Sequence, residues 1–314
     1  MMPDPLHKPV LLQPAVDFLR EHQPRVVVDL TAGRGGHASE LARHLPEESW
    51  VVLCDLDPDN LAAATSRVEA VGGPSVLPIQ GSFTRAPRIL KEKGLLADAV
   101  LADLGFASNQ VDDSNRGFSF MRDGPLDMRM DPSSPVTAAR IVATASQPEL
   151  TRIIREYGED PMAGRIARKL VHIREETPIE RTADLARLVR EAYGPRARSS
   201  RLHPATRTFQ ALRIAVNDEM GALDGLLRQV ERGAELAAEG RPDWLAPRCR
   251  LAIITFHSLE DRRVKQGFAK LEQRGLGQRS ARKPIIADES EIVDNPRARS
   301  AKLRIAKVGD PAGD

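Results

Sequence analysis

One short segment has the residue types and spacing to hold a nucleotide-like ligand: DLTAGRGGH, residues 29–37. It follows an apolar run and precedes a helical pattern, so its glycines fall in a turn between an expected strand and an expected helix. Such a turn exposes bare backbone to a ligand, and the N-terminus of the following helix favours an anion. The pattern Gly33-x-Gly35-x-x-Ala38 fits NAD. The same turn preceded by Asp29 equally fits S-adenosylmethionine (SAM), and a turn that only packs a helix on a strand is a third interpretation.

Two further residues are placed to contact the same ligand. Asp55 ends a second apolar run, 20 residues after Gly35, where a carboxylate accepts both ribose hydroxyls of either cofactor. Phe83 follows a third run, where it either covers one face of an adenine or belongs to the core. A dehydrogenase would also need a His or Lys acid near a second α/β unit, and none is evident. The sequence therefore favours SAM over NAD.

A fourth apolar run ends in Asp103, which is the candidate catalytic residue. In doubly wound sheets, ligands lie outside the carboxyl ends of the strands, so Asp103 is expected to face the ligand. Enzymes that methylate amino groups place an Asp, Asn or Ser here, because an amine conjugated to a ring is a poor nucleophile. An acceptor draws the lone pair out of conjugation and orients the amine. The usual Asp/Asn-Pro-Pro-aromatic form is absent, and a carboxylate that caps the next helix is the alternative.

The elements that must position these residues alternate in the first third of the chain. Helices between strands predict a doubly wound parallel sheet, so the fold class is α/β. The expected strands are 25–31, 50–57, 75–83 and 97–105, with helices at 37–45 and 58–71.

The alternation then stops, and from 106 to 205 the pattern is helical without a convincing strand. The expected helices are 146–158, which opens with the capping box Ser146 and Glu149, and then 165–173 and 182–194. One long helix is expected over 208–230, strands return at 249–258 and 301–308, and loops are expected over 233–248 and 274–290. The simplest architecture is an open sheet split by a helical insertion.

Composition and charge limit the class of protein. Hydrophobic residues make up 41% of the 314 residues and charged residues 29%, which is typical of a globular chain. No apolar run is long enough to span a bilayer, and the N-terminus lacks the pattern of a signal peptide. Cys54 and Cys249 lie in apolar runs and predict buried thiols in a reducing compartment. The sequence thus predicts a soluble, cytoplasmic protein.

The small net charge of +2 hides two basic regions. Residues 161–215 hold 12 Lys and Arg against 5 Asp and Glu, and residues 262–307 hold 13 against 5. Such asymmetry favours a polyanionic partner, although solvated helix faces decorated with arginine give the same count.

Several longer strings carry a resemblance to a known family. They are HKPVL (7–11), RGFSFMRDGPLDMRM (116–130), HPATRTFQALR (203–213), FHSLEDR (256–262) and NPRARSA (295–301). The chain closely resembles, nearly end to end, the bacterial methyltransferases that modify the N4 amino group of a decoding-centre cytosine in 16S ribosomal RNA, the RsmH (MraW) family. The resemblance implies a Rossmann-like SAM-binding sheet interrupted by a helical domain. We place the SAM-binding domain at 1–110 and 206–314, and the inserted substrate-recognition domain at 111–205.

The resemblance also implies which residues contact the cofactor, and it implies no metal. The matching positions are Gly35, Gly36, His37, Asp55, Phe83, Asp103 and Gln110. FASN (106–109) stands where the family commonly has Val-Ser-Ser-Pro, a change that leaves Asp103 and Gln110 in place. Phe118, Phe120 and Met128 either cover the target base or pack in the core.

The implied reaction is SAM-dependent methylation of that cytosine, with 16S ribosomal RNA, within the small ribosomal subunit, as partner and with no membrane. Asp103 is expected to hold the amine or accept its proton, and the cytosine must leave its stack to reach it. The alternative is a SAM-dependent methyltransferase that acts on a different RNA or on a protein. A protein substrate would leave the two basic regions without a use.

Overall fold

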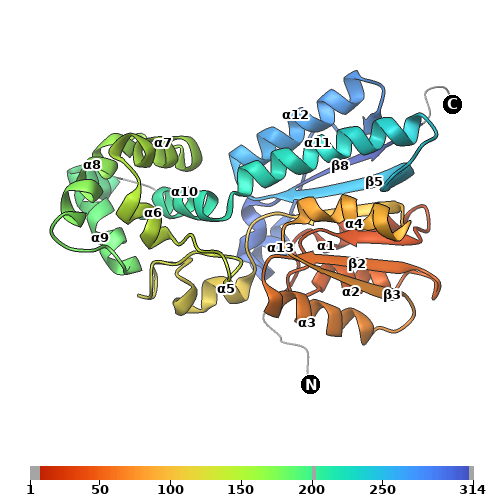
Figure 1. The fold of residues 1–314 in the computed structure, drawn as a ribbon, viewed down its shortest axis with the longest axis horizontal. Coiled ribbons are helices and arrows are strands. Elements are labelled where there is room, and N and C mark those ends of the chain that lie inside the picture. The colour runs from red at the N-terminus through yellow and green to blue at the C-terminus, as the bar shows by residue number, and fades with distance from the viewer. Residues whose placement is uncertain (1–7, 200–202, 311–314) are drawn as a thin grey trace. The chain divides into compact units, whose positions relative to one another are not determined.

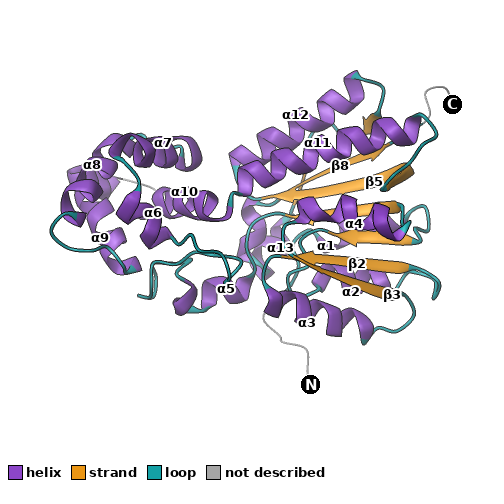
Figure 2. Cartoon of the chain, in the orientation of Figure 1, coloured by secondary structure: helices purple, strands orange, loops and turns teal. Residues whose placement is uncertain are grey.

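The computed structural model describes residues 8–199 and 203–310, and it divides into two compact units. The sheet unit comprises Met1–Gly105 and Met220–Asp314, and the helical unit comprises Phe106–Glu219. Figure 1 labels the elements of both, and Figure 2 distinguishes strands from helices. Every named strand of the described residues belongs to the sheet unit.

The sheet has the strand order β3-β2-β1-β4-β5-β8-β6, with β7 beside β8. The strands β1 to β5 pair in parallel, and β8 is antiparallel to β5. This arrangement confirms the predicted α/β class with a doubly wound sheet. The strands are β1 (Val26–Asp29), β2 (Trp50–Asp55), β3 (Ser75–Gln80), β4 (Ala97–Asp103), β5 (Leu245–Thr255), β6 (Gly277–Arg279), β7 (Ile285–Ile286) and β8 (Lys302–Val308).

Helices cover both faces of this sheet because successive side chains of a strand point to opposite faces. Val26 and Val28 share one core with side chains of α4, α11 and α12, whereas Val27 lies in another with α1. A third core joins α2 and α3 to β2. The helices of this unit are α1 (Leu12–Arg20), α2 (Gly36–Ala42), α3 (Pro58–Glu69), α4 (Ala86–Lys93), α11 (Glu219–Ala238), α12 (Ser258–Gln273) and α13 (Glu289–Asp294).

The helical unit has its own core, formed mainly by α6 to α10. Its helices are α5 (Ser108–Asp112), α6 (Ala138–Thr144), α7 (Gln147–Gly158), α8 (Ala163–Arg174), α9 (Thr182–Tyr193) and α10 (Ala205–Asn217). The predicted capping box of α7 is confirmed, since Ser146 accepts from the Glu149 backbone N–H and donates to its carboxylate. Leu150, Ile153 and Ile154 are buried as their spacing predicts.

The single long helix predicted over 208–230 is wrong. The chain forms α10 and α11 with a break at Asp218, whose φ of 48° is left-handed. The apolar stripe serves two separate cores: Phe209 and Leu212 lie in the core of the helical unit, and Leu223 lies in that of the sheet unit. The apolar periodicity alone predicts one straight helix. The chain turns instead, because the two halves of the apolar stripe pack in different cores.

The compact units also differ from the domain boundaries placed on the sequence. The helical unit extends from Phe106 to Glu219 rather than from 111 to 205. The reason at the later boundary is that α10 packs on α7, so the apolar residues of α10 belong to the helical core.

Both predicted loops contain regular structure. Within 233–248, α11 continues to Ala238 and β5 begins at Leu245, and within 274–290 lie the short strands β6 and β7. Both cysteines are buried free thiols, as predicted. None of the helices in the described part of the chain combines the length and apolar character that a membrane span requires.

Candidate active site

Three aspartates end three neighbouring parallel strands. Asp29 is the last residue of β1, Asp55 of β2 and Asp103 of β4. Because β1 lies between β2 and β4, the strand order changes direction there, and crevices at such switch points bind ligands in open α/β sheets. The structure thus brings to one edge the three aspartates that the sequence analysis named separately.

The glycine turn connects β1 to α2 with left-handed backbone at Gly33 (φ 50°) and Gly35 (φ 77°). A Cβ on Gly35 would lie 2.9 Å from the Cα of Ala64 in α3, and one on Gly36 would lie 2.4 Å from Cγ of Pro9. Close packing within the protein therefore already explains why both positions are glycine. Their contact with a cofactor stays a prediction.

Asp55 fastens this turn to the end of β2. Its Oδ2 accepts from the Gly33 N–H at 2.7 Å, and its Oδ1 accepts from the Asp57 N–H at 2.8 Å. Burial raises the pKa of Asp55 to about 6, against the lowering effect of these backbone donors. Each carboxylate oxygen has a second lone pair, so both can still accept a hydroxyl.

Thr31 links the ends of β1 and β4. Its Oγ1 accepts from the Asp103 N–H at 2.6 Å and hydrogen-bonds to the Asp29 carboxyl, which also accepts from the Thr31 N–H at 3.1 Å. Burial raises the pKa of Asp29 to about 7, and the nearby Asp55 adds to the effect. This link fixes the backbone from which the Asp103 side chain projects.

The carboxyl of Asp103 lies against His37. The Oδ2 atom is 3.7 Å from Nδ1 of His37, within ion-pair range but too long for a hydrogen bond, and the buried Oδ1 has no hydrogen-bond partner in the described structure. Burial, followed by the charges of Asp29 and Glu260, raises the pKa of Asp103 well above its usual range. A buried acceptor without a donor is costly, so this atom indicates a place for a ligand donor.

The N-terminal segment 8–11 orients His37. Nε2 of His37 lies 3.0 Å from the Val10 carbonyl oxygen, which fits donation from that ring nitrogen. The Leu11 N–H donates to Glu291 at 2.6 Å, and Asn295 donates to the Lys8 carbonyl at 2.9 Å. Residues 8–11 of one family string therefore meet Asn295 of another, and they hold the imidazole beside Asp103.

Sequence reasoning missed Glu260. It is 1% exposed and accepts from the backbone N–H groups of Phe256 (2.8 Å) and His257 (3.3 Å) at the start of α12. His257 caps α12 by accepting from the Glu260 N–H at 3.4 Å. The spacing His-x-x-Glu after a strand is a capping-box pattern with His in place of Ser or Thr, and this signal could have found the pair.

The other predicted residues belong to the helical unit or pack in cores. Phe83 packs against the core of the sheet unit. Gln110 belongs to the helical unit, where its Oε1 accepts from the Ala107 N–H at 3.0 Å. Three residues were expected either to cover the target base or to pack in the core. Two of them pack in the core: Met128 is fully buried, and Phe120 contacts Phe209.

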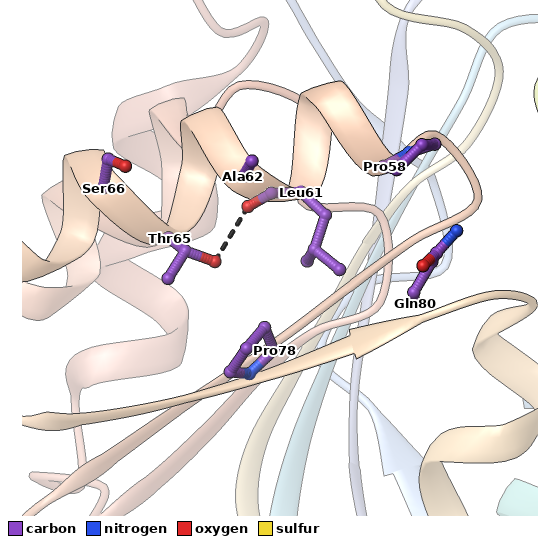
Figure 3. Close-up of a pocket in the computed structure, with 7 residues that line it drawn as sticks. All are labelled: Pro58, Leu61, Ala62, Thr65, Ser66, Pro78 and Gln80. Atoms are coloured by element: carbon purple, nitrogen blue, oxygen red, sulfur yellow. Dashed lines mark hydrogen bonds between the residues drawn. The ribbon is translucent and has the colours of Figure 1, made fainter.

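A hollow of about 360 Å³ opens between α3 and β3 (Figure 3). Its wall is neutral, and none of its residues was predicted as a site residue. The lining residues are Pro58, Leu61, Ala62, Thr65, Ser66, Pro78 and Gln80. Gln80 pairs with Asp55 across β2 and β3, so the hollow begins at the same sheet edge as the candidate site.

The fold and the site fit a SAM-dependent methyltransferase, and comparison with known proteins gives its family. The model of the MraW methylase family matches residues 4–308, so the chain belongs to this family. It is 42% identical to ribosomal RNA small subunit methyltransferase H of Solidesulfovibrio magneticus, covering 98% of this chain and 97% of that protein. It is 44% identical to the protein of the same name from Halorhodospira halophila, covering 96% and 94%. The family predicted from the sequence strings is thereby confirmed.

The packing of Gly35 gives a first prediction. Gly35→Ala should lower the free energy of unfolding of the sheet unit by about 1–3 kcal/mol more than Gly72→Ala, because overpacking adds to the cost of the left-handed backbone. Gly72 is a matched control, since it has the same φ of 77° and a Cβ there would meet no heavy atom within 4 Å. Urea unfolding followed by the fluorescence of Trp50 and Trp244, both in the sheet unit, measures the difference. Equal losses of stability in the two variants would contradict it.

Proposed function

We propose that this chain transfers the methyl group of SAM to the N4 amino group of a cytosine in the 16S ribosomal RNA of the small ribosomal subunit. The observation that supports it best is the unpartnered, buried Oδ1 of Asp103 at the switch point of the sheet. An acceptor at this place suits an amine that has to be oriented and then lose a proton. The relatives named for small-subunit ribosomal RNA support RNA as the substrate.

The residues present fit SAM. Asp55 would accept the ribose hydroxyls with the lone pairs that its two backbone bonds leave open. The glycine turn would offer backbone to the methionine part, while Phe83 and, from the family resemblance, Gln110 would contact the remainder. SAM supplies a methyl group on a sulfonium, which is already a good leaving group. The protein therefore mainly has to align the amine and exclude water.

Asp103 and its neighbours would carry out the remaining chemistry. Oδ1 would accept a hydrogen bond from the N4 amine, direct its lone pair toward the methyl group and receive the proton as the new bond forms. Thr31 fixes the backbone of Asp103, and His37, held by the Val10 carbonyl, limits the rotation of its carboxyl.

Transfer of a labelled methyl group tests this function. The purified protein, given isotope-labelled SAM and small subunits that lack the modification, should place the label in N4-methylcytidine of the 16S RNA. Asp103→Asn keeps an acceptor but loses the charge, and it should slow single-turnover methylation by about 10²-fold or more. Label found in protein or on another RNA, or an unchanged rate in the variant, would contradict the proposal.

The role of Asp55 gives a separate prediction about binding. Asp55→Ala should weaken SAM binding by about 1–3 kcal/mol, because the hydroxyls lose their acceptor and the turn loses its link to β2. Titration calorimetry with SAM measures the change. Asp59→Ala, which alters an exposed acid in the first turn of α3, is the control and should bind normally. Unchanged affinity in Asp55→Ala would remove this residue from the cofactor site.

The two basic regions differ in how far their charges are neutralised. In residues 262–307, many cations pair with acids, as Arg274 does with Glu231 and Arg304 with Asp261. In the helical unit several exposed arginines have no acidic partner among the described residues: Arg165, Arg168, Arg190 and Arg198. Unpaired cations gain most from phosphate, so the helical unit is the better candidate for holding RNA.

Salt dependence tests this assignment. Replacing Arg196 and Arg198 by Gln should weaken RNA binding and reduce the slope of log affinity against log salt by about 0.7–0.9 for each phosphate that is no longer neutralised. Arg201 completes this group in the sequence and lies outside the described residues. Arg274→Gln, which removes a paired cation, should change the slope less. A double variant with the slope of the unaltered protein would show that these arginines are only solvated.

A further inference from the structure

Acidic side chains crowd the edge of the sheet where the proposed reaction takes place. Asp29, Asp55 and Asp103 end three adjacent strands, and Glu260 lies in the first turn of α12, which follows β5, the strand next to β4. Asp29 and Glu260 are each 1% exposed. No Lys or Arg of the described residues forms an ion pair with any of the three aspartates. The three aspartates therefore share one edge without a Lys or Arg partner among the described residues.

Among the three aspartates, the carboxyl of Asp103 has the fewest hydrogen-bond partners. Asp29 and Asp55 accept backbone N–H bonds, whereas Asp103 has one oxygen without a partner and the other 3.7 Å from His37. Burial and the charges of Asp29 and Glu260 raise the pKa of Asp103 and so favour its neutral form. A positive charge brought close to the carboxyl would reverse that preference.

SAM brings such a charge, and its product S-adenosylhomocysteine (SAH) does not. The two ligands share the adenosine, the amino group and the carboxylate, and they differ in the methyl group and in the charge of the sulfur. A group that responds to SAM and not to SAH therefore responds to the sulfonium.

We propose that Asp103 loses its proton to solvent when SAM binds and takes a proton back from the N4 amine when the methyl group is transferred. The proposal rests on the function proposed above. In the transfer, the bond from N4 to the methyl carbon forms as the carbon–sulfur bond breaks, and that electron pair stays on sulfur. The amine proton passes to the Asp103 carboxylate. The net reaction releases one proton, and it leaves at binding rather than during transfer.

Two consequences follow for the charge of the site. The carboxylate balances the sulfonium before transfer, and the neutral acid accompanies the neutral sulfide after it, so the net charge near Asp103 stays constant. SAM should also bind more tightly as pH rises through the range in which Asp103 titrates, by up to about tenfold per pH unit. SAH should lack this dependence, because its binding leaves the proton in place.

Other titratable groups face Asp103 and must be separated from it. His37 lies beside it, Asp29 and Glu260 act on it by charge, Asp55 faces Asp29, and His257 lies 3.2 Å from Glu260. Asp55 would contact the ribose, which both ligands share. Protons that Asp55 exchanges thus cancel in the difference between SAM and SAH.

Calorimetry of the full-length protein without ligand tests the proposal. SAM and SAH are titrated at several pH values in phosphate and in Tris, whose ionisation enthalpies differ, so that the heats give the protons released. We expect SAM to release up to about one proton more than SAH. Asp103→Asn should remove this difference and give the two ligands parallel pH profiles. Asp59→Asn, which alters an exposed acid of the same unit, should keep it.

The outcomes are distinct. Equal proton release with SAM and SAH overturns the proposal, and this comparison needs no variant. A SAM-specific release that persists in Asp103→Asn overturns the assignment to this residue, and its loss in His37→Gln instead would move it to the imidazole. If the protein binds neither ligand, the proposed cofactor site fails, whereas SAM binding without a SAM-specific release overturns this inference alone.

Discussion

Parallel strand pairing brings the ends of β1, β2 and β4 to one edge, and each of these strands ends in an aspartate. Like charges at a buried edge repel, and burial itself disfavours carboxylates. Backbone N–H groups offset this cost by donating hydrogen bonds to the carboxylates. Thr31 donates to Asp29, and Gly33 and Asp57 donate to Asp55. The conformation of the glycine turn therefore depends on its hydrogen bonds to Asp29 and Asp55.

The same turn determines where α2 begins and hence where His37 lies. Close contact of Gly36 with Pro9 allows the N-terminal segment to cross the start of α2, so that the Val10 carbonyl reaches the imidazole. That segment is in turn fixed by Glu291 and Asn295, which are some 280 residues away in the chain. Residues at both ends of the sequence thus control one side chain at the centre of the site.

Local patterns predicted the parts of this site that depend on local structure. Apolar runs located β1, β2 and β4, and the parallel pairing of these strands brings their terminal aspartates together. The cap formed by His257 and Glu260 also follows a local spacing, but that spacing was not used. The partner of His37 depends on a contact between distant segments, which no local pattern records. The break at Asp218 was missed for a related reason: the apolar periodicity continues across it, and only the separation of two cores interrupts the helix.

The distribution of charge explains why one chain would need two units for this task. An edge lined by Asp29, Asp55, Asp103 and Glu260 suits a cationic sulfonium but repels the phosphates of an RNA. In the sheet unit many cations are already paired with acids, as Lys270 is with Glu231. Exposed arginines without acidic partners among the described residues occur in both units, and those of the helical unit belong to a part of the chain with its own core. Folding the charges proposed to hold RNA around the separate core of the helical unit would let them accumulate without neutralising the acids proposed for the chemistry.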